Sequence, residues 1–131
     1  MNDLLKHKAE VLVALARRNI ERDGHLVPVA VVILKTGHGW ARALDFSTPE
    51  NKARYLNAAY RMLELDDVAA VVVMAEAWWV TCASLENLPI PSEHPDRKEC
   101  INVTVVTRSE KRGAIVPFQR EGGRIVTETP R

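Results

Sequence analysis

Residues 68–81 read VAAVVVMAEAWWVT, and this stretch decides the fold. Its apolar part is too short to cross a membrane as a helix, which takes about 20 residues. A short run that is apolar at nearly every position and rich in valine is typical of a strand buried on both faces. We therefore expect a protein built on a sheet, with Val68–Thr81 in a central position.

The segments before this strand predict a helix, a hairpin and a second helix. Residues 3–22 carry apolar side chains at intervals of three and four, the spacing of an amphipathic helix, and Gly24 marks its end. Residues 26–34 and 40–46 resemble strands on either side of a glycine-containing turn, which predicts a hairpin. The sequence Thr-Pro-Glu at 48–50 predicts a helix start, because Thr can cap the first turn and Pro suits the first helical position.

The segments after the central strand predict a long loop and further strands. Residues 86–99 contain three prolines and many charged side chains, and such a loop is longer than most connections within a domain. Strand-like segments follow at 100–107 and 114–119, with a short one at 124–127. The element order is therefore α-β-β-α-β-β-β, with room for one more short strand.

This order predicts a single α+β domain over residues 1–131, with one antiparallel or mixed sheet of about five strands. We expect both helices to pack on one face of that sheet. Adjacent residues of a strand point to opposite faces, so either Trp78 or Trp79 would lie on the face without helices. Exposed aromatic patches often mark partner surfaces. We therefore expect a homodimer or small oligomer joined by a sheet face or edge, unless the 86–99 loop covers that face.

Composition narrows the class of protein. The chain has 47% hydrophobic and 27% charged residues, the mixture of an ordinary soluble domain. Its 18 basic and 17 acidic residues give a net charge of +1, which argues against a nucleic-acid binder, although a protein partner stays open. The N-terminal residues include early charges and no apolar signal segment, and Cys82 and Cys100 form no disulfide framework. We expect a cytoplasmic protein that is not in a membrane.

Glu76 is the most unusual residue of the central strand. An ionised carboxylate is costly to bury unless it is paired or hydrogen-bonded. One interpretation is a general base or metal ligand. The other is structural, with Glu76 paired to Arg42 or to an arginine of the 86–99 loop and fixing a register or an interface. The sequence leaves both interpretations open.

The loop supplies the other candidate residues. The stretch PSEHPDRKE at 91–99 combines acidic, basic and histidine side chains, and loops on rigid scaffolds often carry function. The catalytic candidates are Glu76, His94 and Asp96. Spacings such as HExxH or paired CxxC are missing, so no metal site is predicted, and no cofactor can be named. The candidates for ligand or interface contacts are Trp40, Arg42, Trp78, Glu93, Arg97 and Glu99.

Two functions remain in view. We expect an oligomeric binding or accessory protein, and the alternative is a small-ligand or metal-assisted enzyme with its site at Glu76 and the 86–99 loop. An enzyme requires the loop to close over Glu76 and leave a concave pocket with convergent polar groups. A binding module requires a flat or paired surface there, with Glu76 tied to an arginine.

Overall fold

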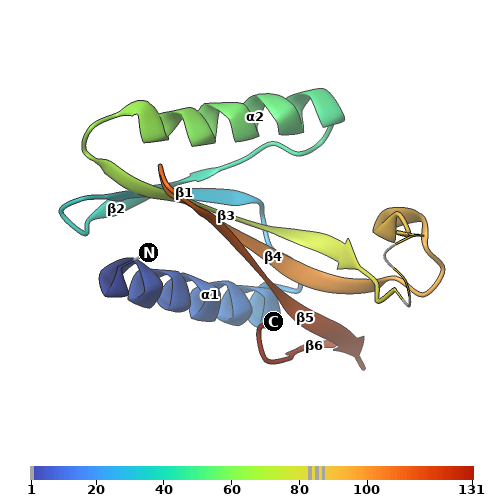
Figure 1. Cartoon of the computed structure of the whole chain (residues 1–131). Coiled ribbons are helices and arrows are strands. Elements are labelled where there is room, and N and C mark those ends of the chain that lie inside the picture. The colour runs from blue at the N-terminus through green and yellow to red at the C-terminus, as the bar shows by residue number, and fades with distance from the viewer. Residues whose placement is uncertain (1, 83, 85, 87) are drawn as a thin grey trace.

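The computed structural model describes residues 2–82, 84, 86 and 88–131. Within these residues, two α-helices and a six-stranded antiparallel sheet form the α+β fold that the sequence predicts, with one strand more than expected (Figure 1). The sheet order is β2-β1-β3-β4-β5-β6. The elements are α1 (Asp3–Asp23), β1 (Val29–Leu34), β2 (Gly39–Ala43), α2 (Pro49–Arg61), η1 (Met62–Glu64), β3 (Val68–Trp79), η2 (Pro91–Glu93), β4 (Lys98–Val106), β5 (Lys111–Glu121) and β6 (Arg124–Thr127).

Side-chain caps explain where the helices begin. The Asn2 side chain accepts the Leu5 N–H at 2.9 Å before α1, and the Thr48 hydroxyl accepts the Asn51 N–H at 3.1 Å before α2. Gly24 ends α1 with φ at 79°, a left-handed conformation that favours glycine. The predicted start of α2 and the predicted end of α1 are therefore confirmed. No helix in the described part of the chain has the length and apolar character needed to cross a membrane.

β3 lies in the middle of the sheet, as its sequence predicts. It pairs with β1 on one side and β4 on the other, so that Val72 lies opposite both Val31 and Val105. Val71 and Val72 point to opposite faces and both are fully buried. Because both faces of β3 are covered, every residue from Val68 to Ala75 is apolar.

The two helices cover opposite faces of the sheet, so the expectation that they share one face is wrong. Ala70 and Val72 of β3 pack in one hydrophobic cluster with α1, and Val71 and Val73 pack in another with Ala59 of α2. Figure 1 shows α2 on one side of the strands and α1 on the other. β2 and β3 run in the same direction on either side of β1, so α2 is a crossover helix. Connections between parallel strands of one sheet are almost always right-handed. This preference places α2 on one face of the sheet, and α1 covers the other face.

The two hydrophobic clusters differ in extent. The cluster under α1 draws on every strand except β2, and it includes Ile101 and Val116, both fully buried. The cluster under α2 is smaller and draws on β1 and β3. Trp78 and Trp79 lie beyond the part of β3 that α2 covers and point to opposite faces, as expected of adjacent strand residues.

Candidate functional site

Arg120 joins two of the four acidic candidates, Glu76 and Glu99, near the C-terminal end of β3. Its Nε lies 3.0 Å from Oε2 of Glu99, and its Nη2 lies 3.4 Å from Oε1 of Glu76. Its Nη1 donates to the carbonyl oxygen of Gly24 at 2.9 Å. The other oxygen of Glu76 accepts the Leu26 N–H at 3.1 Å. We call this group of residues the Arg120 clamp.

Register explains why these side chains meet. Glu99 lies opposite Trp78 on β3 and opposite Phe118 on β5, so Arg120, two residues beyond Phe118, lies on the same face. The clamp ties β3, β4 and β5 to the connection between α1 and β1. Among the described residues, Glu76 pairs with Arg120 of β5 and not with Arg42 or a loop arginine, which corrects both partners expected from the sequence.

Glu76 is not a buried isolated acid. Its side chain is 32% exposed, and each carboxylate oxygen has a hydrogen-bond donor. A cavity of about 430 Å³ lies at this end of the sheet, between Trp78, Trp79 and Arg97, but Glu76 does not line it. The arrangement suits an anchor between segments better than a proton-transfer group facing a substrate.

The loop candidates fall into two groups. The Arg97 guanidinium lies 4.7 Å from the ring centroid of Trp78, a cation–π contact, and also donates to the carbonyl oxygen of His94 at 3.1 Å. Nδ1 of His94 accepts the Asp96 N–H at 3.0 Å. Arg97 is therefore held against the sheet, while the hydrogen bonds of His94 and Asp96 run within the loop.

Among the residues that the structure describes, the catalytic candidates Glu76, His94 and Asp96 are not seen to converge. In that part of the chain, no hydrogen bond or ion pair links Glu93, His94 or Asp96 to Glu76, and no three His, Cys, Asp or Glu side chains form a group that could hold a metal ion. Asn87, inside the predicted loop, lies outside the described residues.

Trp40 and Arg42 lie elsewhere, on β2. They line a cavity of about 330 Å³ between α2 and the β1–β2 hairpin, which we call the α2 pocket. The Arg42 guanidinium lies 5.5 Å from the ring centroid of Tyr55 on α2. The sequence identifies the two strand residues, whereas Tyr55 and Arg54 of α2 were missed because nothing in the sequence shows which helix face meets β2.

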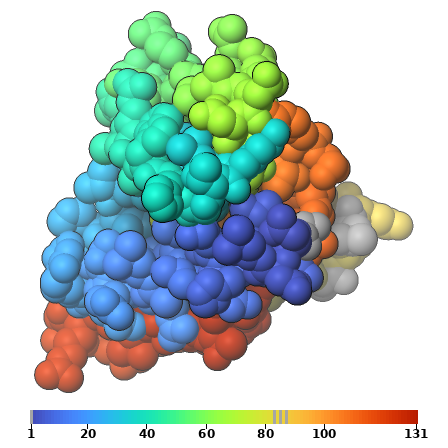
Figure 2. Space-filling model, turned by 90° about the vertical axis from the view of Figure 1, so that its left-hand side faces the viewer, coloured from blue at the N-terminus to red at the C-terminus, as the bar shows by residue number. Residues whose placement is uncertain are grey.

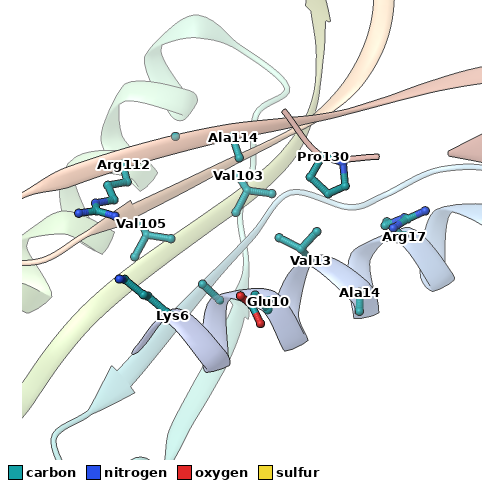
Figure 3. A pocket seen from close by; sticks show the side chains of 12 residues that line it. Lys6, Glu10, Val13, Ala14, Arg17, Val103, Val105, Arg112, Ala114 and Pro130 are labelled. Atoms are coloured by element: carbon teal, nitrogen blue, oxygen red, sulfur yellow. The ribbon is translucent and has the colours of Figure 1, made fainter. Parts of the chain in front are cut away.

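A second hollow lies between α1 and strands β4 and β5, with a volume of about 440 Å³. In Figure 3, Val13 of α1 points toward Val103 and Val105, while Lys6 and Arg112 lie at one end of the hollow and Arg17 lies at the other. Its arginines are engaged, because Arg112 pairs with Glu110 at 3.0 Å and Arg17 donates to Thr127 at 3.1 Å. Glu10 also lines it, so the hollow carries charges of both signs.

The two edges of the sheet differ. At the β6 edge, the Thr127 hydroxyl donates to Glu21 and accepts from Arg17, which ties this edge to α1. Pro130 follows in a segment that continues to pair with β5, and proline discourages further strand addition. All five residues of β2 are exposed, and no backbone hydrogen bond to its outer side occurs among residues 2–82, 84, 86 and 88–131. Figure 2 shows β2 in cyan at the surface, between α1 in blue and α2 in green.

Comparisons with protein families, with curated proteins and with solved structures find no match for this chain. The class of protein is therefore defined by its fold and its surfaces. It is an α+β domain in which a sheet is covered by one helix on each face, with a charged clamp at one end of β3 and an open edge at β2.

Proposed function

We propose that this chain is a homodimeric binding or accessory protein and that two copies join through their β2 strands. The observation that carries the proposal is the open β2 edge, in a sheet whose other edge is tied to α1. Because the helices lie on opposite faces, the surface for self-association is an edge and not an uncovered face. The engagement of both Glu76 oxygens supports a non-catalytic role for that residue.

The hydrogen-bond alternation of the hairpin identifies which backbone groups face outward. The Leu34 N–H donates to His38 at 2.7 Å, and the Leu44 N–H donates to Pro28 at 2.8 Å. In an antiparallel pair, every second residue directs its backbone groups toward the partner strand. Residues 40 and 42 therefore bond to β1, and Ala41 directs its N–H and C=O toward the open edge.

A two-fold axis through Ala41 makes this edge complementary to itself. Two β2 strands running antiparallel would exchange hydrogen bonds at Ala41, and Trp40 would lie opposite Arg42 of the partner subunit. Such non-hydrogen-bonded pairs bring Cα atoms to about 4.5 Å, the closest approach in an antiparallel sheet. An arginine over an indole ring is a favourable cation–π pair, and the symmetry makes it twice.

Light scattering coupled to size-exclusion chromatography tests the proposal. We expect a mass about twice the chain mass of 14.7 kDa for the wild type. Ala41→Pro removes the central outward N–H and should give a monomer, because proline at an edge position costs the parent sheet no ladder bond. Ala41→Val keeps the N–H and should stay dimeric. A monomeric wild type, or a folded Ala41→Pro dimer, would overturn the proposal.

A residue exchange tests the pairing across the axis. Trp40→Arg alone places Arg against Arg42 of the partner subunit and should weaken the dimer. Adding Arg42→Trp restores an arginine–tryptophan pair in the opposite order. The double variant should therefore dimerise more strongly than the single variant. If the single variant dimerises like the wild type, or the double variant stays as weak as the single one, the pairing is wrong. Circular dichroism confirms that each variant is folded.

A further inference from the structure

We infer that the α2 pocket binds a small organic anion with a flat aromatic body, of the aryl carboxylate class. The inference rests on the proposed role as a binding protein and names its ligand class, and the pocket shares Trp40 and Arg42 with the proposed dimer edge. The lining residues that the argument uses are Trp40 and Arg42 of β2 and Arg54, Tyr55 and Ala58 of α2.

The walls of the pocket favour an apolar, flat ligand. Trp40 of β2 and Tyr55 of α2 contribute two aromatic rings, and apart from two arginines the remaining walls are alanine, valine, leucine and methionine side chains. The volume of about 330 Å³ falls within the usual range for small-molecule sites.

The charges of the pocket favour an anion. Among the residues that the structure describes, its two charged lining residues are Arg42 and Arg54, and no acidic side chain lines it. Over the described positions of the chain, neither arginine forms an ion pair or a side-chain hydrogen bond, and the contact of Arg42 is with the Tyr55 ring. A guanidinium group offers a planar fork of donors that matches a carboxylate. An anionic head group with an apolar body therefore complements both parts of the pocket.

Asp45, the acidic residue between β2 and α2, is not the counterion of the two pocket arginines. Asp45 accepts the Ser47 N–H at 2.8 Å and the side-chain amide of Asn51 at 3.0 Å. The hydrogen bonds from Ser47, and that from Asn51, lower the pKa of Asp45. Asp45 is thus engaged at the start of α2, and among the described residues it forms no ion pair with Arg42 or Arg54.

The hollow under α1 provides the contrast within the same molecule. It is larger, but its Arg112 already has a carboxylate partner and Glu10 lines its wall. It also lacks an aromatic side chain. Inorganic phosphate fits the α2 pocket less well than an aryl carboxylate, because a small hydrated anion would leave the apolar walls and both rings without contact.

Titration calorimetry with 2-naphthoate tests the inference, with the neutral 2-naphthamide as the matched control for charge. We expect the wild type to bind 2-naphthoate, and Arg54→Gln to weaken binding about tenfold because a charge-assisted hydrogen bond is lost. Arg61→Gln changes an arginine of the same helix outside the pocket and should bind like the wild type. Ala58→Leu narrows the pocket and should also reduce binding.

Three results would overturn the inference: no binding of 2-naphthoate, equal binding by the Arg54→Gln variant, or 2-naphthamide binding as tightly as the carboxylate. Displacement of 2-naphthoate by equimolar inorganic phosphate would show that the ligand need not be aromatic, and would overturn the proposed ligand class. Arg54 lies on α2 and away from the β2 edge, so light scattering on the same samples reports the dimer separately. If the protein is a dimer but does not bind 2-naphthoate, the proposed ligand class is wrong. If it binds 2-naphthoate as a monomer, the proposed dimer is wrong.

Discussion

Arg120 and Glu76 are 44 positions apart in the sequence, and their side chains meet at 3.4 Å across the sheet. Arg120 also contacts Glu99 and the carbonyl oxygen of Gly24, so one guanidinium connects strands β3, β4 and β5 with the end of α1. The contact supports the structural interpretation of Glu76, in which the acid holds the α1–β1 connection against the sheet.

Arg120→Met should lower the free energy of unfolding by about 1–2 kcal/mol, because a backbone carbonyl and the carboxylate of Glu99 lose this donor and Glu76 loses one of its two. The Arg120 side chain is 47% exposed, and solvent screening keeps the effect at the low end. Urea denaturation followed by circular dichroism measures the change. Arg124→Met is the control, because Arg124 of β6 is exposed and, among the residues described, has no ion pair or side-chain hydrogen bond. Equal stability of the two variants would contradict the structural role of the clamp.

The two cysteines should differ sharply in reactivity. Cys82 is exposed, whereas Cys100 of β4 is 1% exposed, and burial raises the pKa of its thiol from 9.0 to about 11. Since the thiolate is the reactive form, a shift of this size leaves about a hundredfold less of it near neutral pH.

Labelling with a thiol reagent at pH 8 checks this difference. The Cys82→Ser variant should react slowly, with a rate that keeps rising with pH up to about 11, whereas the Cys100→Ser variant should react quickly. In denaturant the two variants should react alike. Fast labelling of Cys82→Ser under native conditions would contradict the burial of Cys100.

The local elements could be predicted from the sequence because their signals are local. Thr48 and Gly24 mark helix ends by their own chemistry, and the apolar run of β3 reports a strand buried on both sides. That run already conflicts with two helices on one face, since a second layer must cover the alternate residues. The face of the sheet that α2 covers depends on the crossover from β2 to β3. No local sequence pattern predicts that crossover.

The partner of Glu76 could not be predicted for a similar reason. Several arginines lie in the last third of the chain, and the choice among them depends on the register of β4 with β5. That register places Phe118 opposite Glu99 and brings Arg120 to the same face. The acid at position 76 was visible in the sequence, but its neighbours follow from pairings between strands that no single segment encodes.

Gly39 provides a test of the β1–β2 hairpin on which the proposed dimer depends. A Cβ atom at this position would lie 2.4 Å from the carbonyl oxygen of Val32, a backbone atom that cannot move without disturbing β1. Gly39→Ala should therefore lower the free energy of unfolding by about 1–3 kcal/mol, the usual cost of overpacking.

Gly113→Ala is the matched control for this substitution. Gly113 lies in β5, where an added Cβ would find its nearest neighbour, the Val103 carbonyl oxygen, at an ordinary contact distance of 3.8 Å. This variant should keep or slightly raise the stability, because alanine loses less conformational entropy than glycine on folding. Urea denaturation of both variants measures the difference. Equal stabilities would mean that the hairpin relaxes around the added methyl group, and the register that directs Ala41 outward would then lose its support.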